Sequence, residues 1–180
     1  METMHGNGRF DRYYRRIQLG LRLLSHGARA QTASEWSELT PDRLVTLRRR
    51  WLPDASEGLR GPAPTSFQIF FRSALRTTHA TLFATIHQTL CQDSDASAKR
   101  EAHPSLESGE FLCEAYEIFR EWEEDADMGF DQAVLLAEGA AKGEVIKLAH
   151  CPRCRRAVLI DKLARRRETC PTCRRHSVNL

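Results

Sequence analysis

The sequence predicts a mainly α-helical protein with a small metal-binding module at its C-terminal end. Through most of the chain, apolar residues recur at the three- and four-residue spacing of amphipathic helices. Four of the six cysteines stand in two Cys-x-x-Cys pairs within the last thirty residues. A chain of 180 residues can build a helical core and carry such a module. We therefore expect a helical body over residues 11–143 and the module over residues 144–180.

The first helix is expected over residues 11–25, where arginines fill one side and apolar residues the other. The residues expected to face the core are Tyr14, Ile17, Leu21 and Leu24. Gly27 follows at the position of a helix-ending glycine. This segment is therefore predicted to be an amphipathic helix that packs along one face.

Two short helices joined by a tight turn are predicted over residues 28–51. Thr40 can accept a hydrogen bond from a free backbone N–H, and Pro41 suits the first helical position. The helix starting at Pro41 would bury Leu44, Leu47 and Trp51. It would direct outward Arg43, Arg48, Arg49 and Arg50. A helix-turn-helix-like pair can place its second helix in a DNA groove, although paired short helices are also common in helical cores.

Three further helices are expected in the body. A long one, rich in phenylalanine, covers residues 66–90, an acidic one covers 110–126, and a shorter one covers 131–141. The glycine- and proline-rich stretch 54–64 reads as a connector. Residues 91–109 are rich in small and polar residues and are expected to form a loop or linker.

The two cysteine pairs are predicted to bind one Zn²⁺ per chain. A Cys-x-x-Cys turn places two thiolates on one side of a tight loop, and a second such turn completes a tetrahedral site. The expected ligands are Cys151, Cys154, Cys170 and Cys173, between flanking apolar segments expected to be short strands. His150 and His176 lie beside the pairs, so a site of three cysteines and one histidine stays open as an alternative.

Four protein ligands leave no open position on the metal for water or substrate, so the predicted zinc is structural and the protein is not expected to be an enzyme. The tail after His150 contains few apolar residues. We expect it to need the metal in order to fold.

The charge of the chain is strongly segregated. Residues 1–60 carry eleven arginines against seven acidic residues, residues 61–150 carry seven basic against fifteen acidic, and residues 151–180 carry nine against two. Two basic ends favour binding to a polyanion such as DNA, whereas an acidic centre suits solvent or a protein partner. The alternative is that the tail's charge serves solubility and thiolate neutralisation.

The candidate DNA contacts are arginines in the basic parts of the chain. They are Arg43, Arg48, Arg49, Arg153, Arg155, Arg156, Arg165, Arg166, Arg167, Arg174 and Arg175. The sequence contains no apolar run of the length that spans a membrane, and no membrane partner is expected. Reduced cysteines in metal-binding spacing indicate a cytoplasmic protein.

Taken in order, these segments resemble the flagellar transcriptional activator subunit FlhC. The residues that carry the resemblance are Ile17, Gln18, Leu19, Gly27, Ala28, Arg29, Leu39, Thr40, Arg43 and Leu44, followed by the four cysteines. The resemblance implies a mainly helical fold, a structural Zn²⁺ on those cysteines, and a hetero-oligomer with a small helical partner resembling FlhD. It also implies binding to promoter DNA of flagellar operons and assistance to RNA polymerase.

The function expected from the sequence is therefore a DNA-binding subunit of a transcriptional activator. The alternative is a protein-interaction adaptor whose zinc module is only a structural cap. The two differ in DNA binding, because many phosphate contacts produce a steep dependence of affinity on salt.

Overall fold

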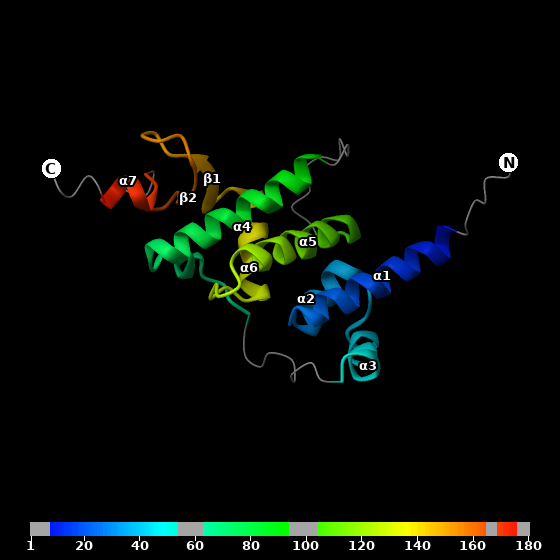
Figure 1. Ribbon diagram of the computed structural model, residues 1–180. Coiled ribbons are helices and arrows are strands. Elements are labelled where there is room, and N and C mark those ends of the chain that lie inside the picture. Colours follow the sequence, from blue (N-terminus) through cyan, green and yellow to red (C-terminus); the bar gives the residue numbers. More distant parts are fainter. Residues whose placement is uncertain (1–7, 54–62, 94–103, 165–168, 176–180) are drawn as a thin grey trace. The chain divides into compact units, whose positions relative to one another are not determined.

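The computed structural model describes residues 8–53, 63–93, 104–164 and 169–175 (Figure 1). The described residues are mainly helical and include one two-stranded sheet, which confirms the predicted fold class. None of their helices is both long and apolar enough to cross a membrane.

The chain divides into two compact units, and each is described by itself. The first unit comprises residues 1–62 and 103–113, and the second comprises residues 63–102 and 114–180. The boundary expected from the sequence, between residues 143 and 144, falls inside the second unit. The segment after residue 143 therefore belongs to the same compact unit as helices that precede it.

Three helices build most of the first unit: α1 (Gly8–Ser25), α2 (Ala30–Ser37) and α3 (Pro41–Trp51). Gly27 follows α1 with a φ of +87°, a left-handed conformation that glycine adopts without strain. The Thr40 side chain accepts a hydrogen bond from the backbone N–H of Arg43 at 3.4 Å and caps α3. Local sequence signals therefore fix where these helices begin and end.

The core of the first unit lies between α1, α2, α3 and the segment 103–113, whose Gly109 lies against Leu19. Leu19, Leu23 and Leu44 are all at most 2% exposed. A Cβ atom on Gly20 would lie only 2.8 Å from Cδ2 of Leu44, so the two helices approach closely because Gly20 has no side chain. Leu19 and Leu23 lie on the buried side of α1.

Two expectations about buried faces are wrong. Of the four residues predicted to face the core from α1, only Leu24 is buried, whereas Tyr14 is 54% exposed. Trp51 was expected to be buried but is 62% exposed. It is the last residue of α3, beyond the turns in which Leu44 and Leu47 pack inward.

The second unit contains most of the remaining elements. In chain order these are the 3₁₀ helix η1 (Phe67–Phe71), α4 (Ala74–Asp93), α5 (Leu106–Trp122), α6 (Phe130–Lys142), β1 (Ile146–His150), β2 (Ala157–Asp161) and α7 (Pro171–Arg175). The first residues of α5, through Cys113, belong to the first unit. The predicted helix over 131–141 is confirmed as α6, which Gly143 ends in a left-handed conformation.

The predicted single helix over residues 66–90 is wrong. Ser66 caps η1 by accepting from the N–H of Gln68 at 3.3 Å, and Ser73 accepts from the N–H of Arg76 at 3.1 Å at the start of α4. A second capping serine inside the apolar stretch therefore starts a new helix.

The expected loop over residues 91–109 is also too long at both ends, because α4 continues to Asp93 and α5 starts at Leu106. Ser105 accepts a hydrogen bond from the N–H of Ser108 at 3.2 Å in the first turn of α5. Residues 94–103 of the expected loop and 54–62 of the expected connector lie outside the described residues.

The two strands form an antiparallel hairpin in which Ile146 lies opposite Asp161 and His150 lies opposite Ala157. The predicted flanking strands are thus confirmed. Strand β2 packs against α4 and β1 against α6. The backbone N–H of Leu159 donates to the Thr81 hydroxyl of α4 at 3.0 Å. The hairpin is consequently attached to the helices of its unit by packing and by a hydrogen bond.

The hairpin buries apolar side chains against the helices of its unit. Ile146, Val158 and Leu159 are each at most 1% exposed. Burying such side chains contributes roughly 1.5 to 3 kcal/mol each. The hairpin therefore has a source of stability that does not depend on metal.

Aromatic packing marks the centre of the second unit. The rings of Phe83 and Phe119 meet edge to face with centroids 6.0 Å apart. The ring of His87 stacks on Phe83, and burial lowers the pKa of His87 to about 4. His87 is therefore a neutral packing residue at pH 7.

Candidate metal centre

The first cysteine pair lies in the turn that joins β1 to β2. The backbone N–H of Cys151 donates to the carbonyl of Arg156 at 2.8 Å, and the N–H of Arg155 donates to the carbonyl of Cys151 at 2.9 Å. Arg155 has a φ of +63°, in the left-handed region that favours glycine. The turn holds Cys151 and Cys154 at one end of the hairpin.

The second pair lies at the start of α7. Pro171 occupies the first helical position, and the N–H of Arg174 donates to the carbonyl of Cys170 at 3.0 Å. The N–H of Cys173 points to the sulfur of Cys170 at 3.4 Å. This one short turn brings Cys170 and Cys173 to the same side.

The four sulfur atoms of the two pairs form one cluster, in which every sulfur lies within 4.8 Å of the others. The sulfurs of Cys154 and Cys170 are 3.6 Å apart. A tetrahedral ion with metal–sulfur bonds of about 2.3 Å separates its sulfurs by about 3.8 Å. The cluster is thus close to the size of a four-thiolate site, and it could hold a metal ion.

Backbone amides already favour a thiolate in this cluster. The N–H of Cys170 lies 3.5 Å from the sulfur of Cys151. This amide and that of Cys154 lower the pKa of Cys151 to about 6. In contrast, hydrogen bonding with Cys170 raises the pKa of Cys173 to about 12. Four adjacent sulfurs cannot all ionise without a cation. A bound cation would lower the pKa of Cys173 again, because it stabilises the thiolate.

The surroundings of the cluster are apolar on one side. Cys151 and Cys170 are buried together with Val158 and Ile160 of β2. Cys154 is exposed. The site therefore sits at the edge of the hairpin's core, where a metal ion would join the hairpin to α7.

The other two cysteines and the two histidines that flank the pairs are not part of this cluster or lie outside the described residues. His150 is exposed at the end of β1, and His176 lies outside the described residues. Cys113 is buried in α5, and Cys91 lies in α4 with its sulfur 3.8 Å from Nε2 of His87. The four cysteines of the two pairs come together without any of these residues.

The structure places the candidate DNA-binding arginines in two sets. Arg43 and Arg49 are exposed on α3 in the first unit. Arg48 is half-buried, and its Nε is buried with no hydrogen-bond partner among the described residues. In the second unit Arg153, Arg155, Arg156 and Arg174 are exposed around the cysteines. Arg165, Arg166, Arg167 and the side chain of Arg175 lie outside what the structure describes.

The sequence did not reveal the contacts that attach the cysteine-bearing hairpin to the helices. Thr81 donates to the carbonyl of Thr77 at 2.7 Å while accepting from Leu159. Gln68 of η1 donates to the Asp161 carboxylate at 2.8 Å. The only feature of the sequence that hints at this attachment is the row of threonines at four-residue spacing along α4. Each of their hydroxyls can donate to the carbonyl one turn earlier and still accept a hydrogen bond from another element.

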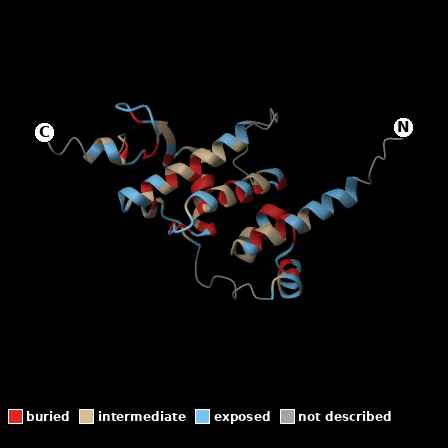
Figure 2. Ribbon diagram, in the orientation of Figure 1, coloured by how far each residue is buried: buried red, intermediate tan, exposed pale blue. Residues whose placement is uncertain are grey.

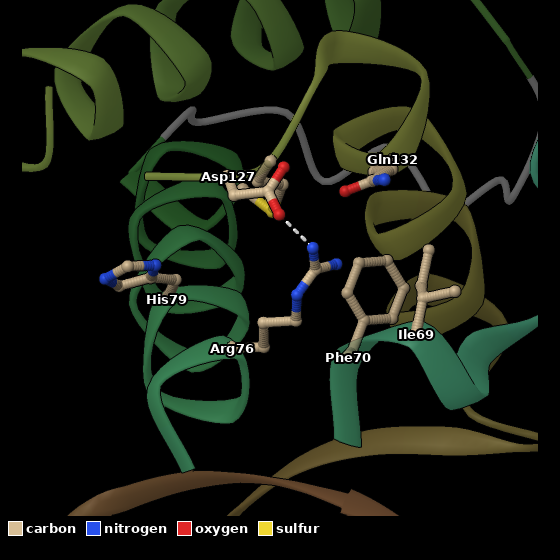
Figure 3. A pocket seen from close by; sticks show the side chains of 7 residues that line it. Ile69, Phe70, Arg76, His79, Asp127 and Gln132 are labelled. Carbon is tan, nitrogen blue, oxygen red and sulfur yellow. Dashed lines mark hydrogen bonds and ion pairs between the residues drawn. The ribbon is translucent and has the colours of Figure 1, made fainter. Parts of the chain in front are cut away.

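A small hollow in the second unit is lined by side chains from η1, α4 and the segment before and into α6 (Figure 3). The guanidinium of Arg76 pairs there with the carboxylate of Asp127. His79 contacts Glu123 at 3.5 Å. These pairs tie α4 to the loop after α5, which indicates a structural role.

The fold and the site together define a mainly helical protein with a candidate four-thiol metal centre. No family model and no curated protein matches this chain. The functional interpretation consequently depends on the residues and their geometry.

The conformation of Arg155 gives a direct test of the turn. Arg155→Gly is expected to keep the metal content and raise the free energy of unfolding by up to about 1 kcal/mol, because glycine adopts a positive φ without strain. Arg156→Gly is the matched control, since Arg156 has no positive φ. Glycine there only raises the conformational entropy of the unfolded chain and should lower the free energy of unfolding. Metal analysis and thermal unfolding measure both. An Arg155→Gly protein that lost its metal would show that the arginine side chain itself supports the site.

Proposed function

We propose that the chain is a DNA-binding subunit of a hetero-oligomeric transcriptional activator, with one structural Zn²⁺ on Cys151, Cys154, Cys170 and Cys173. The observation that carries the proposal is the arrangement of the first unit, in which α2, a three-residue turn and α3 follow one another and both helices pack on α1. Two short helices joined by a three-residue turn and packed on a third resemble a helix-turn-helix unit, whose second helix enters the major groove of DNA.

The turn between the helices is well defined. Glu38 ends α2 in the left-handed conformation with a φ of 57°, and Leu39 is buried at 7% exposure. Thr40 then caps α3. A buried residue in the middle of the turn fixes the direction in which α3 leaves α2.

The exposed side of α3 suits a polyanion. Leu44 and Leu47 face the core, whereas Arg43, Thr46, Arg49 and Arg50 are exposed. Arginine can donate two hydrogen bonds to guanine or to phosphate, and a threonine hydroxyl can contact base edges. Arg43 lies in the first turn, the part of a recognition helix that meets bases.

Zinc is the metal that four tetrahedral thiolates favour, and such a site is closed to substrate. The ion would hold the hairpin turn against α7 and thereby fix the exposed arginines of the second unit. These arginines are proposed as phosphate contacts, because arginines on a compact scaffold neutralise the DNA backbone.

The finer parts of the proposal are supported by the resemblance of the chain to FlhC. According to this resemblance, the chain binds flagellar promoters, assembles with a small helical partner resembling FlhD, assists RNA polymerase and is located in the cytoplasm. The order of the elements, with a helix-turn-helix-like segment first and the cysteine pairs last, is what supports them. An adaptor without DNA-binding activity is the competing function.

DNA binding is tested by titrating the purified chain, alone and with a FlhD-like partner, against flagellar promoter fragments at several salt concentrations. Arg43→Ala and Arg49→Ala are each expected to weaken binding by about tenfold, since a good base or phosphate contact contributes roughly 1 to 3 kcal/mol. A phosphate contact would also reduce the salt slope by about one, whereas a base contact would relax sequence preference.

Arg72→Ala is the control, because Arg72 is exposed in the second unit and is not among the proposed contacts. It should change affinity less than about twofold if only nonspecific charge is lost. Equal effects of Arg43→Ala and Arg72→Ala would contradict a recognition role for α3. Absence of any defined DNA complex would favour the adaptor.

A further inference from the structure

Cys154 is the exposed member of the four-cysteine cluster. Cys151 and Cys170 are 0% and 7% exposed, and Cys173 is half-buried. Cys154 lies in the turn between β1 and β2, where residues 152–156 are all exposed (Figure 2). Of the four cysteines, Cys154 is therefore the most open to a reagent dissolved in water.

The surroundings of Cys154 favour reaction at its sulfur. Its neighbours in the turn, Arg153 and Arg155, are exposed arginines. Cysteines that react with oxidants are accessible thiolates in electropositive settings. A metal ion bound to the cluster holds its cysteine ligands as thiolates, and the thiolate is the form that attacks an oxidant.

A second sulfur lies within reach of the first. The sulfurs of Cys154 and Cys170 are 3.6 Å apart, and a disulfide bond requires a separation of about 2 Å. The N–H of Cys170 points to the sulfur of Cys151 at 3.5 Å, which keeps the second pair beside the turn. The hydrogen bond from Leu159 to Thr81 holds the hairpin in place without metal. The two sulfurs are therefore positioned to form a bond.

We propose that the cluster is a thiol switch, in which a hydroperoxide oxidises Cys154 and Cys170 to a disulfide and the bound metal ion is released. The proposal rests on the zinc site of the proposed function but not on DNA binding. Because Cys154 and Cys170 belong to different pairs, the new bond joins the hairpin turn to α7.

The oxidation takes place in two steps, written here for hydrogen peroxide. The Cys154 thiolate attacks one peroxide oxygen, the O–O bond breaks, and a sulfenic acid forms while the second oxygen leaves as hydroxide. The Cys170 thiolate then attacks the sulfur of Cys154, so that the S–S bond forms and the S–O bond breaks with loss of hydroxide. Each hydroxide takes up a proton and becomes water. The two sulfurs together lose the two electrons that the peroxide gains.

Oxidation removes the ion without removing the link between the hairpin and α7. Cys151 and Cys173 remain as thiols, and two protein ligands are too few for a structural zinc site. The disulfide holds the turn against α7 in place of the ion. A thiol reductant attacks the disulfide and restores the ligands, so the change is reversible.

Metal release and disulfide mapping test the switch. The full chain with Cys91→Ser, which removes an exposed thiol outside the cluster, is loaded with zinc, freed of excess metal and treated with hydrogen peroxide. A chromophoric chelator should report release of about one zinc per chain. Mass spectrometry of unreduced peptides should show Cys154 joined to Cys170. Dithiothreitol and added zinc should restore the original metal content.

Two histidine substitutions test the choice of sulfur. Cys154→His keeps four protein ligands, because histidine also binds zinc, but it removes the sulfur that reacts first. Its release of zinc under peroxide should be at least about tenfold slower, since the remaining sulfurs are less accessible. Cys173→His is the matched control, because it replaces a ligand outside the proposed bond. Its release should stay within about twofold of the parent protein.

The outcomes separate this proposal from the zinc site on which it rests. Zinc retained in excess peroxide, or a disulfide confined to one Cys-x-x-Cys pair, would overturn the switch and leave the zinc site standing. Equal release from Cys154→His and Cys173→His would also overturn it. A purified chain that binds no zinc would overturn both proposals. If a histidine variant fails to hold zinc, the disulfide mapped in the parent protein decides.

Discussion

Cys170→Ser is expected to remove the metal and release α7 while the helices of the second unit stay folded. Cys170 is buried in the cluster, and its N–H also contacts the sulfur of Cys151. Serine is a poor ligand for a thiophilic ion, and three sulfurs bind far more weakly than four. If the proposed zinc site is correct, the metal content should fall from about one ion per chain to near zero after dialysis against a chelator.

The hairpin should survive this loss. Ile146, Val158 and Leu159 remain buried against the helices, and Leu159 keeps its hydrogen bond to Thr81. Hydrogen exchange followed by mass spectrometry should therefore show continued protection of β1 and β2 and loss of protection in α7. X-ray absorption of the unaltered protein should show sulfur ligands only. Nitrogen in the spectrum would restore the alternative with a histidine ligand.

Two other cysteines provide the controls. Cys91→Ser alters an exposed residue and should change neither zinc content nor stability measurably. Cys113→Ser alters a buried residue, so it should cost about 1 kcal/mol of stability and leave zinc content unchanged. If Cys113→Ser lost the metal, or Cys170→Ser kept all of it, the assignment of the ligands would be wrong.

Features set by a few neighbouring residues could be predicted from the sequence. Thr40 and Pro41 start α3, and Gly143 ends α6. Each of these residue types suits the backbone conformation or the hydrogen bond that is needed at its position. The cysteine cluster was predictable for the same reason, because each Cys-x-x-Cys turn fixes its own geometry. Only the meeting of the two turns required tertiary structure.

Features that depend on contacts between distant residues could not be predicted. Periodicity showed that α1 has an apolar face. Which side of α1 is buried depends on contacts with residues distant in the sequence, such as the close approach of Gly20 to Leu44 and the ion pair of Arg16 with Glu38. Likewise, the sequence did not show that Ser73 caps a helix, because the break between η1 and α4 lies inside a continuous apolar stretch. The attachment of the hairpin through Thr81 joins residues 78 positions apart, and no sequence window contains both.

Gly20→Val is expected to separate α1 from α3 and to abolish sequence-specific DNA binding while zinc binding continues. The first side-chain atom of valine would lie 2.8 Å from Cδ2 of Leu44 and 3.1 Å from Cδ1 of Leu39, and its two methyl groups would extend further into the same space. Overpacking of this kind costs about 1 to 3 kcal/mol. The first unit is small, so a loss of this size is a large fraction of its stability.

The consequence for DNA binding follows from the position of Leu39 and Leu44. Leu39 fixes the turn before α3, and Leu44 fixes the buried side of α3, so displacing both changes the orientation of Arg43 and Arg49. Hydrogen exchange should increase over α1 to α3 and stay unchanged in the hairpin. Gln18→Val, on the exposed side of α1, is the control for β-branching in the helix and should retain DNA affinity. If hydrogen exchange shows that α1 to α3 have loosened in Gly20→Val, wild-type DNA affinity in that protein would mean that α3 does not act as the recognition helix.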